Sequence, residues 1–588
     1  MAKNRKRERT KNWQKTLIRV WKYLDVYRGQ LFLVLFLVLL TSGLALLGPY
    51  LIGKTVDEYI AKAGESSLAT ILIIIAIVYL FFSLGSYLQN YWMIGIGQKT
   101  VFTMRKQLFE HLHDLPISFF DKRQHGELMS RLTNDIDNVS QTLNSSIIQI
   151  FSSVLTLIGT VVVMLLLSPL LTFIAMMVIP LMYFGMRWIT NRTSKLFKEQ
   201  QKHLGELNGF IQETMSGQTI VKTFSQEEKV IAEFLEKSNQ LKRAGYWAQT
   251  YSGFIPKLMN MLNNLSFAVI AGAGGILALR GHVTIGTIIV FTEYSRQFTR
   301  PLNDLANQFN TLLSAVAGAE RVFDILDEDE ERDKKSTVTL QKVDGEVEFD
   351  QVNFGYGDDE QTIKDVSFRA LPGETIALVG PTGAGKTTII HLLARFYELE
   401  SGQISLDGVD IRNIKRNDLR RKIGFVLQDT YLFEGSIREN IRYGRLDASD
   451  KEVENAAKMA NAHSFIKKLP QQYDTVLKQD GGGISQGQKQ LLSIARAMLS
   501  EPSLLILDEA TSNIDTITEM KIQEALYRLM KGRTSFVIAH RLNTIQQADQ
   551  ILVLDNGTII EKGNHQSLLN KKGFYYNLYH HQLAERSS

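Results

Sequence analysis

A glycine-rich loop between an apolar strand and a helix is the feature that most constrains this chain. The strand is predicted over 375–379 and the helix over 389–396. Glycines let successive backbone N–H groups turn toward one anion, because a residue without Cβ adopts the required dihedral angles at low cost. The strand–loop–helix order favours a phosphate-binding loop over an ordinary glycine turn. The loop residues predicted to bind a nucleotide are Gly380, Pro381, Thr382, Gly383, Ala384, Gly385, Lys386, Thr387 and Thr388.

Two side chains of this loop have predicted roles of their own, and an aromatic upstream adds a third. Lys386 can reach the outer phosphates, and the Thr387 hydroxyl can ligate Mg²⁺. Tyr356 lies about two dozen residues before the loop, where its ring could stack on adenine. A tyrosine in a loop is a weak signal by itself, so this role depends on the fold.

A second apolar run, 504–507, ends in two carboxylates, Asp508 and Glu509. Asp508 is predicted to hold the water shell of Mg²⁺, and Glu509 to orient or deprotonate the attacking water. His540 follows another apolar strand, predicted over 535–539. Ligands of open α/β sheets bind at the carboxyl ends of the strands, so these side chains should converge near the glycine loop. An ordinary surface position is the alternative for His540.

The composition limits what surrounds this site. The chain has 588 residues, which is too long for one hydrophobic core and indicates at least two domains. It contains no cysteine, which excludes disulfides and thiolate metal sites. A net charge of +5 is too small to indicate a nucleic-acid partner. Long uncharged runs occupy the first 310 residues or so, whereas the remainder has the composition of a soluble α/β protein.

The N-terminal half contains six long stretches with few charges, each predicted to be a membrane-spanning helix. About 20 apolar residues suffice to cross the hydrocarbon core of a bilayer. A buried helical bundle of a soluble enzyme is the alternative, and the alternation of charge between the stretches argues against it. The predicted spans are Leu31 to Ile52, Leu68 to Ile96, Ser145 to Leu167, Leu170 to Trp188, Phe254 to Leu279 and Ile285 to about Phe309.

Lysine and arginine are concentrated in alternate connections between these spans. They are frequent at the N-terminus and over 98–140 and 187–250, and scarce around 54–66, 168–169 and 280–284. The positive-inside rule therefore predicts a protein of the cytoplasmic membrane with both termini and the two long connections in the cytoplasm. These connections continue the helical pattern, so the spans should project well beyond the membrane.

The first 30 residues carry about ten Lys or Arg, with apolar residues interleaved at near-helical spacing. An amphipathic helix on the cytoplasmic membrane surface fits this pattern. Nucleic-acid binding is the alternative, and the apolar run that follows favours the membrane. No short apolar stretch with a cleavage site is present, so we expect no removable signal peptide.

Two ionisable residues, Glu293 and Arg296, lie one helical turn apart in the sixth span. Charged groups inside a membrane usually face a cavity or a partner. They could line a translocation path together with Asn260, Asn263 and Asn264 of the fifth span, or pair with each other near the cytoplasmic end. The sequence leaves both interpretations open.

A segment between the glycine loop and the paired carboxylates, Ile484-Ser485-Gln486-Gly487-Gln488, resembles the signature segment of ABC transporter ATPase domains. In that resemblance Gln428 is the Q-loop residue, Ser512-Asn513-Ile514-Asp515 is the D-loop and His540 is the switch histidine. The match extends over about 345–580.

The N-terminal half is similar to the same family. Phe119-Phe120-Asp121 and Glu213-Thr214-Met215-Ser216-Gly217 resemble the intracellular coupling segments of type IV ABC exporters. Six spans ahead of one ATPase domain is the half-transporter layout of that family.

The resemblance implies a dimer that binds two molecules of ATP with Mg²⁺ between its ATPase domains. Each ATP contacts the phosphate loop of one chain and the signature segment of the other, so Ser485, Gly487 and Gln488 would serve the partner's nucleotide. The resemblance assigns Gln428 to the Mg²⁺ site and to catalysis, beside Glu509.

The sequence departs from the family pattern at the signature, where Gln486 replaces the first of two adjacent glycines, and in the preceding segment, 478–483. A side chain at Gln486 restricts backbone approach to a γ-phosphate, so the site that this signature completes should hydrolyse ATP poorly. Glu509 and His540 are intact. The combination resembles the catalytically competent subunit of bacterial heterodimeric multidrug exporters, of the EfrD or LmrD kind. A tolerated glutamine in a homodimer is the alternative.

These features predict an α-helical transmembrane bundle fused to an α/β P-loop ABC ATPase domain. The expected parts are an N-terminal amphipathic segment (1–30), a six-helix transmembrane domain with two cytoplasmic coupling regions (31–320), a linker (321–344) and the nucleotide-binding domain (345–588).

The expected function is ATP-driven efflux of hydrophobic or amphipathic compounds by alternating access, as one half of a heterodimer. The implied partners are a second half-transporter, the lipid bilayer and hydrophobic drug-like substrates, without nucleic acid. A homodimeric exporter of lipids or peptides and an ATP-gated regulatory membrane protein are the alternatives. An apolar cavity is permissive, so the sequence does not name the cargo.

Overall fold

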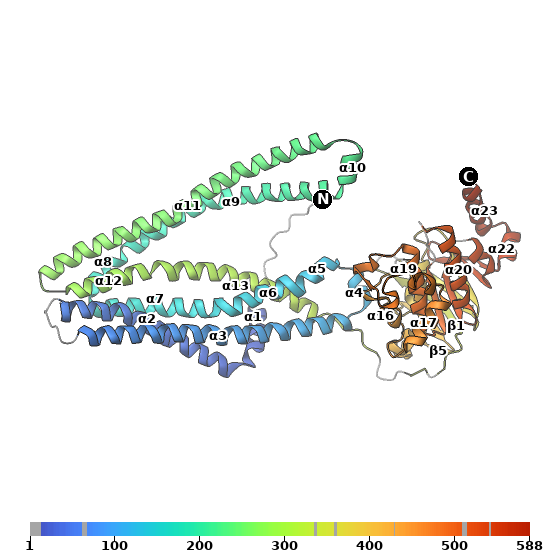
Figure 1. The fold of residues 1–588 in the computed structure, drawn as a ribbon, viewed down its shortest axis with the longest axis horizontal. Helices are drawn as coiled ribbons and strands as arrows, with labels where there is room; N and C mark the ends of the chain where they lie inside the picture. The colour runs from blue at the N-terminus through green and yellow to red at the C-terminus, as the bar shows by residue number, and fades with distance from the viewer. Residues whose placement is uncertain are drawn as a thin grey trace. The chain divides into compact units, whose positions relative to one another are not determined.

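The computed structural model describes residues 13–60, 68–333, 338–340, 342–357, 361–428, 430–508, 514–539 and 542–587. The chain forms two compact units (Figure 1). The helical unit comprises Met1–His113 and His125–Glu328, and the ATPase unit comprises Asp114–Gln124 and Asp329–Ser588. Two predicted catalytic residues, Glu509 and His540, lie outside the described residues.

The helical unit consists of long helices broken by short π-helical turns. Its helices are α1 (Trp13–Asp25), α2 (Arg28–Thr55), α3 (Leu68–Asp114), α5 (His125–Ser130), α6 (Ile136–Gln141), α7 (Ile147–Leu167), α8 (Pro169–Met176), α9 (Val178–Ser216), α10 (Gln218–Thr223), α11 (Glu227–Leu279), α12 (Ile285–Gln297) and α13 (Thr299–Leu326). The π-helical turns are η1 (Val56–Ile60), η2 (Arg131–Asp135) and η3 (Thr142–Ser146).

Five of the described helical stretches are long and apolar enough to cross a bilayer. They are Arg28–Glu58, Leu68–Asp114, His125–Leu167, Pro169–Ser216 and Glu227–Leu279. Between 11% and 33% of the residues in their most apolar windows are buried. Such exposed apolar surface needs lipid or a partner chain to cover it, because water penalises it by about 25 cal/mol per Å².

The sixth predicted span differs from the other five. Residues 285–309 are divided between α12, which has 13 residues, and the start of α13. The new helix begins with Thr299-Arg300-Pro301, and proline has no N–H to continue the preceding helix. The ionisable pair of this region is an ion pair, with Arg296 3.8 Å from Glu293, as the second of the two interpretations expected.

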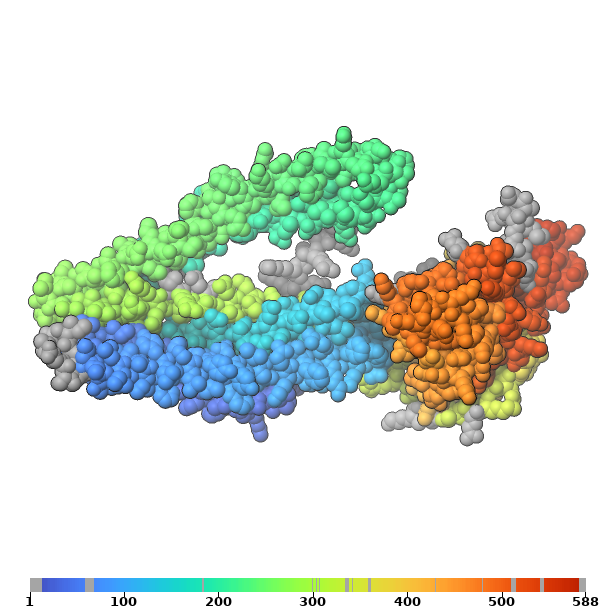
Figure 2. Space-filling view, in the orientation of Figure 1, coloured from blue at the N-terminus to red at the C-terminus, as the bar shows by residue number. Residues whose placement is uncertain are grey.

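Helices α9 and α11 pack along each other and form an arm of the helical unit (Figure 1). The short helix α10 closes the end of this arm, and Figure 2 shows the green arm in space-filling form. Three apolar side chains near this end are mostly exposed: Met215 at 65%, Ile220 at 61% and Phe224 at 66%.

Polar contacts tie distant parts of the helical unit together. The Asp57 carboxylate accepts hydrogen bonds from the Gly286 backbone N–H at 2.7 Å and the Thr284 hydroxyl at 2.5 Å, and so holds the start of α12 against the end of α2. Asp135, which is 3% exposed, accepts from Arg321 of α13 and from Arg131 at 2.9 Å.

The N-terminal helix α1 lies where an amphipathic segment was predicted, and it packs on the last turns of α13. Arg19 pairs with Asp327 at 2.6 Å and lies 4.1 Å from the Phe323 ring centroid. Tyr23 stacks on the same ring at 6.2 Å. Trp13, Ile18 and Trp21 remain more than half exposed on the opposite side.

The ATPase unit is built on two main sheets and a small two-stranded sheet, β7-β8. One sheet has the order β12-β11-β3-β10-β9-β6, and a second has the order β2-β1-β4-β5. The strands are β1 (Val347–Gly355), β2 (Gln361–Ala370), β3 (Thr375–Val379), β4 (Ser401–Leu406), β5 (Val409–Asp410), β6 (Ile423–Val426), β7 (Gly435–Ser436), β8 (Val476–Leu477), β9 (Leu504–Asp508), β10 (Thr534–Ile538), β11 (Gln550–Asp555) and β12 (Thr558–Gly563).

The helices of this unit pack around the sheets. They are α4 (Ile117–Asp121), α14 (Lys386–Leu393), α15 (Arg416–Arg421), α16 (Ile437–Arg442), α17 (Asp450–Met459), α18 (His463–Ile466), α19 (Gln486–Leu499), α20 (Thr516–Met530), α21 (Leu542–Gln547), α22 (His565–Lys571) and α23 (Phe574–Ser587). Helix α4 belongs to this unit although its sequence lies between the two parts of the helical unit.

The six-stranded sheet has a hydrophobic core on each face. Along β3, Ala377 and Val379 contribute to one core, and Ile376 and Leu378 to the other. A strand that is buried on both faces has successive apolar residues rather than an alternating pattern, as residues 376–379 of β3 show. This sheet is the rigid support on which the nucleotide-site loops stand.

Candidate nucleotide-binding site

The glycine loop follows β3 and leads directly into α14, three residues earlier than the predicted helix start. Gly385 precedes α14 with a φ of +98°, and a Cβ there would lie 2.7 Å from Ile363. At Gly380 a Cβ would lie 2.2 Å from the Leu554 carbonyl oxygen. The loop therefore requires glycine at these positions, and it leaves the first N–H groups of α14 without intrahelical partners, as an anion site needs.

Lys386 lies over this loop. Its Nζ donates hydrogen bonds to the carbonyl oxygens of Gly380 and Pro381, each at 2.8 Å. Partial burial lowers the pKa of Lys386, while the nearby Asp508 carboxylate acts in the opposite direction. The ammonium is thus held at the loop mouth, where phosphate oxygens would meet it.

The parallel register brings the other predicted side chains to the same edge of the sheet. Ile538 at the end of β10 pairs with Leu378 of β3 and with Asp508 at the end of β9. Val426, the last residue of β6, pairs with Leu507, and Gln428 follows two positions later. Asp508 therefore lies at the carboxyl edge from which the glycine loop also emerges, as predicted from the sequence, and Gln428 follows a strand that ends at the same edge.

The residues at this edge fit a magnesium nucleotide. The Thr387 side chain is exposed and that of Asp508 is partly exposed, so a hydroxyl and a carboxylate can face an incoming ligand. Among the described residues no group of three or more His, Asp or Glu side chains is placed to hold a metal ion by itself. Mg²⁺ is usually held by one or two protein oxygens together with substrate phosphates, which this sparse donor set suits.

Tyr356 lies just after β1 and is 42% exposed, which leaves part of its ring available to a base. Its hydroxyl donates to the Thr388 hydroxyl at 3.2 Å and lies 3.3 Å from His391 Nδ1. Burial raises the pKa of Tyr356, so its hydroxyl stays protonated at neutral pH. Its hydroxyl thus reaches the residue that ends the glycine loop.

The signature segment forms the start of α19. Ser485 caps this helix by accepting a hydrogen bond from the Gln488 N–H at 3.3 Å, and Gln488 Oε1 accepts from the Ser485 N–H at 3.0 Å. The Ser485 and Gln486 side chains are exposed, whereas Gly487 is buried. A Cβ on Gly487 would lie 2.5 Å from Thr518 Cγ2, so this glycine is required for packing of α19 on α20.

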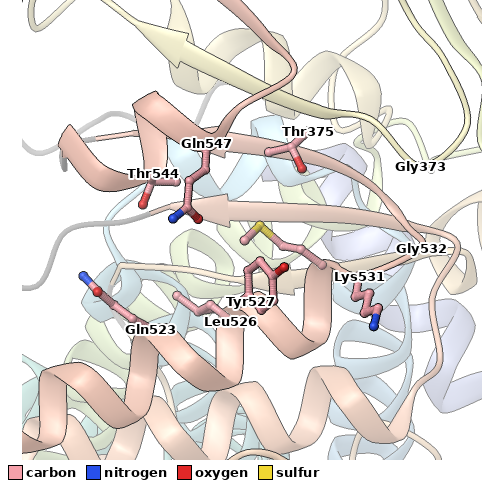
Figure 3. Close-up of a pocket in the computed structure, with 10 residues that line it drawn as sticks. Gly373, Thr375, Gln523, Leu526, Tyr527, Lys531, Gly532, Thr544 and Gln547 are labelled. Atoms are coloured by element: carbon pink, nitrogen blue, oxygen red, sulfur yellow. The ribbon is translucent and has the colours of Figure 1, made fainter. Parts of the chain in front are cut away.

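A cavity of about 220 Å³ occupies another part of the ATPase unit (Figure 3). Tyr527 and Gln523 of α20 and Thr544 and Gln547 of α21 line it. None of the predicted nucleotide-site residues that the structure describes lines this cavity.

Sequence reasoning missed two residues beside this site. Tyr397 donates a hydrogen bond to Asp121 of α4, and His391 on α14 stacks on the Tyr397 ring at 6.0 Å. The hydrogen bond joins positions 276 residues apart, so no local sequence pattern predicts it. The one available signal was the resemblance of Phe119-Phe120-Asp121 to a coupling segment.

The fold and the site define an ABC transporter, and the chain belongs to that family. Residues 31–302 match the family model of the ABC transporter transmembrane region, and residues 363–512 match the family model described as ABC transporter. The protein is an ABC exporter half-transporter, a multi-pass membrane protein whose ATPase is coupled to transport.

Particular relatives cover almost the whole chain. It is 61% identical over 582 residues to the uncharacterized ABC transporter ATP-binding protein YfiC of Bacillus subtilis, which covers 99% of this chain and 96% of that one. It is 47% identical over 481 residues to a fatty acid ABC transporter ATP-binding/permease protein of Mycobacterium bovis, with 82% and 76% covered. The structure of a bacterial Atm1-family ABC exporter with ATP bound superposes with a TM-score of 0.74 at 30% identity, with 95% and 99% covered.

Proposed function

We propose that this chain is the catalytically competent half of a heterodimeric exporter, of the EfrD or LmrD kind, that moves hydrophobic or amphipathic compounds out of the cytoplasm. The ATPase domain and both termini are then cytoplasmic. The exposed start of α19, where Gln486 stands in place of a glycine, is the observation that carries the heterodimer. The apolar surface of the long helices supports a hydrophobic cargo path.

The residues at the sheet edge take the roles that ATP hydrolysis requires. Lys386 holds the outer phosphates, while Thr387, Gln428 and Asp508 hold Mg²⁺, which supplies charge neutralisation on the phosphates when bound. Glu509 orients or deprotonates the attacking water, with His540 assisting. Tyr356 takes the adenine ring.

The exposed signature serves a nucleotide on the partner chain. Ser485 and Gln488 already satisfy each other at the start of α19, so the serine hydroxyl is held at the helix N-terminus that would face a phosphate. Gln486 places a side chain at this surface and weakens close approach of the backbone. The partner contributes an ordinary signature to the ATP bound by this chain, and that site does most of the hydrolysis.

Two helical segments carry domain closure to the membrane helices. One is α4, near Phe120, which groups with the ATPase unit. The other is α10, whose apolar surface at Ile220 and nearby Met215 fits the partner's ATPase domain. Closure on ATP then opens the spans outward, and hydrolysis with product release resets them.

The direct test replaces Glu509. In the assembled dimer Glu509→Gln should leave Mg-ATP binding within about twofold and lower ATP turnover by about two orders of magnitude or more. Binding is measured by calorimetry and turnover by phosphate release. Near-normal turnover would refute the assigned role, and failure of the unmutated protein to bind Mg-ATP would refute the whole proposal. Co-purification from the native membrane identifies the second chain.

A homodimeric lipid exporter is the second candidate. The name of the mycobacterial relative, a fatty acid transporter, favours a lipid-like cargo. Cargo-stimulated ATPase and uphill efflux in vesicles, measured with a fatty acid and with a hydrophobic cationic dye, distinguish the two cargo classes. An absence of uphill movement of either would favour an ATP-gated regulatory protein.

A further inference from the structure

An aromatic cluster joins helix α4 to the phosphate-loop helix α14. Tyr397, which follows α14, lies at its centre, and the Tyr397 hydroxyl donates to the Asp121 carboxylate at the end of α4. The Tyr397 ring meets the Tyr356 ring edge-on, with 5.0 Å between centroids and 90° between planes. Phe354 packs on both rings, at 5.5 Å from Tyr397 and 5.0 Å from Tyr356.

Residues of α14 in the same cluster hold the hydroxyl group of Tyr356. Its hydroxyl bonds to Thr388 at 3.2 Å and approaches His391 at 3.3 Å, while His391 itself stacks on Tyr397. The orientation of the Tyr356 ring is therefore set by α14 at the hydroxyl and by the perpendicular ring of Tyr397. Tyr356 is nevertheless 42% exposed, so these contacts do not bury it completely.

The bond between Tyr397 and Asp121 is charge-assisted. Burial and the Asp121 carboxylate raise the pKa of Tyr397, so the phenol keeps its proton and remains the donor. A neutral donor on an ionised acceptor forms a shorter and stronger bond than a neutral pair does. It is therefore a stiff connection between α4 and the cluster.

Helix α4 packs within the ATPase unit but is covalently joined to membrane helices on both sides. Residues 114–124 group with the ATPase unit, while the chain on both sides of them belongs to the helical unit. The Glu331 N–H also donates to the Asp114 carbonyl at 2.7 Å, which holds the start of this segment. A displacement of the membrane helices therefore reaches Asp121 through continuous chain.

We propose that Tyr397 is a positioning residue through which α4, by way of Asp121, sets the orientation of the adenine-stacking Tyr356. The state of the membrane helices thereby adjusts affinity for the base of the nucleotide. Linkage makes the effect reciprocal, so base binding biases α4 to the same extent. This inference rests on the proposed ATP site. It adds a coupling between that site and the membrane helices that depends on the base of the nucleotide rather than on its phosphates.

The test separates the base from the phosphates. Calorimetry on the purified full-length chain measures binding of Mg-ATP and of magnesium tripolyphosphate, which has phosphates and no base. Tyr397→Phe keeps the ring and removes the hydroxyl, and Asp121→Ala removes its acceptor. Each should weaken Mg-ATP about three- to tenfold, a part of the stacking contribution, and leave tripolyphosphate unchanged.

Three further variants make the result specific. The double variant should bind ATP no more weakly than either single one, because both remove one bond. Asp121→Asn keeps an acceptor oxygen and should retain most of the affinity. Tyr527→Phe, at a mostly exposed tyrosine of α20, is the matched control and should bind both ligands normally.

Two outcomes would overturn the inference. Equal weakening of ATP and tripolyphosphate would mean that the variants damage the phosphate loop in general, and unchanged ATP affinity would mean that Tyr397 does not position the base site. In both cases the unmutated chain still binds Mg-ATP, so the proposed function stands. Failure of the unmutated chain to bind Mg-ATP would instead remove the proposed function.

Discussion

At the scale of single residues, burial and hydrogen bonding decide the protonation state of the groups around the nucleotide site. Burial lowers the pKa of Lys386, and the nearby Asp508 carboxylate opposes this change by favouring the charged ammonium. Tyr356 and Tyr397 keep their protons because burial raises the pKa of each. His391, between them, is held neutral, since burial lowers its pKa below the ordinary 6.5 against the opposing pull of Asp121 and Asp508.

The depressed pKa of His391 predicts acid sensitivity of the ATPase unit. The His391 side chain takes up a proton near the ordinary pKa of 6.5 in the unfolded chain and only at lower pH in the folded chain. The free energy of unfolding should therefore be constant above about pH 7 and should fall as the pH drops below about 6.5. Thermal melting of the full-length protein between pH 5.5 and 7.5 measures this.

His565 supplies a second contribution of the same sign, because burial lowers its pKa as well. His391→Gln and His565→Gln should each remove part of the loss of melting temperature between pH 7 and pH 5.5, and the double variant more. An unchanged acid-side slope in the double variant would show that other groups cause the acid sensitivity.

At the scale of elements, close helix contacts depend on individual glycines and caps. Gly487 allows α19 to lie on α20, since a Cβ would come 2.5 Å from Thr518 and 3.1 Å from Ile514. The same glycine was predicted from the sequence to contact the partner's nucleotide. The structure adds the packing requirement within the chain, which a signature pattern does not reveal.

Gly487→Ala should therefore destabilise the ATPase unit by about 1–3 kcal/mol through overpacking. Gln486→Ala, one residue away on the exposed side, should change stability by less than about 0.5 kcal/mol. Comparative thermal melts of the two variants decide this. Equal melting temperatures would show that α19 can shift without cost.

The start of α12 depends on Asp57 in a similar way. Its carboxylate holds the Gly286 N–H and the Thr284 hydroxyl, while Gly286 has no room for a Cβ beside the Gly53 carbonyl oxygen. Asp57→Ala should lower stability by about 1–3 kcal/mol, because two hydrogen bonds to a charged acceptor are lost.

The neighbouring Glu58 supplies the control for this prediction. It pairs with Lys54 only at 3.8 Å and is half exposed, so Glu58→Ala should cost less than about 1 kcal/mol. Melting of both variants in detergent gives the comparison. A Glu58→Ala variant as unstable as Asp57→Ala would contradict the role given to Asp57 at the start of α12.

At the scale of the whole molecule, the proposed function requires a second chain to complete each hydrolytic site. In a homodimer both nucleotides would be completed by a signature containing Gln486. We therefore expect the chain expressed alone to hydrolyse ATP at least about tenfold more slowly than the pair with its partner subunit. Gln486→Gly should raise the activity of the lone chain.

Phosphate release from the purified lone chain, the pair and the lone Gln486→Gly chain tests this. A lone chain as active as the pair would support the homodimeric exporter. A Gln486→Gly variant without any gain would show that the glutamine is not what limits the composite site.

Much of the architecture follows from local patterns in the sequence. The phosphate loop is determined by glycine spacing after an apolar strand, and β3 spans Thr375–Val379 as predicted. The long helices follow from uncharged runs that only lipid or a partner can cover. Parallel strand order brings Asp508 and Gln428 to the edge of the glycine loop, as a rule for open sheets anticipates.

Contacts between residues far apart in the chain were decided only by the tertiary structure. The bond from Tyr397 to Asp121, the place of 114–124 in the ATPase unit and the division of the sixth predicted span at α12 and α13 are of this kind. Periodicity and motif spacing describe the backbone of a segment and the face that it buries. They do not specify which distant side chain fills that face, because the choice depends on the packing of the complete fold.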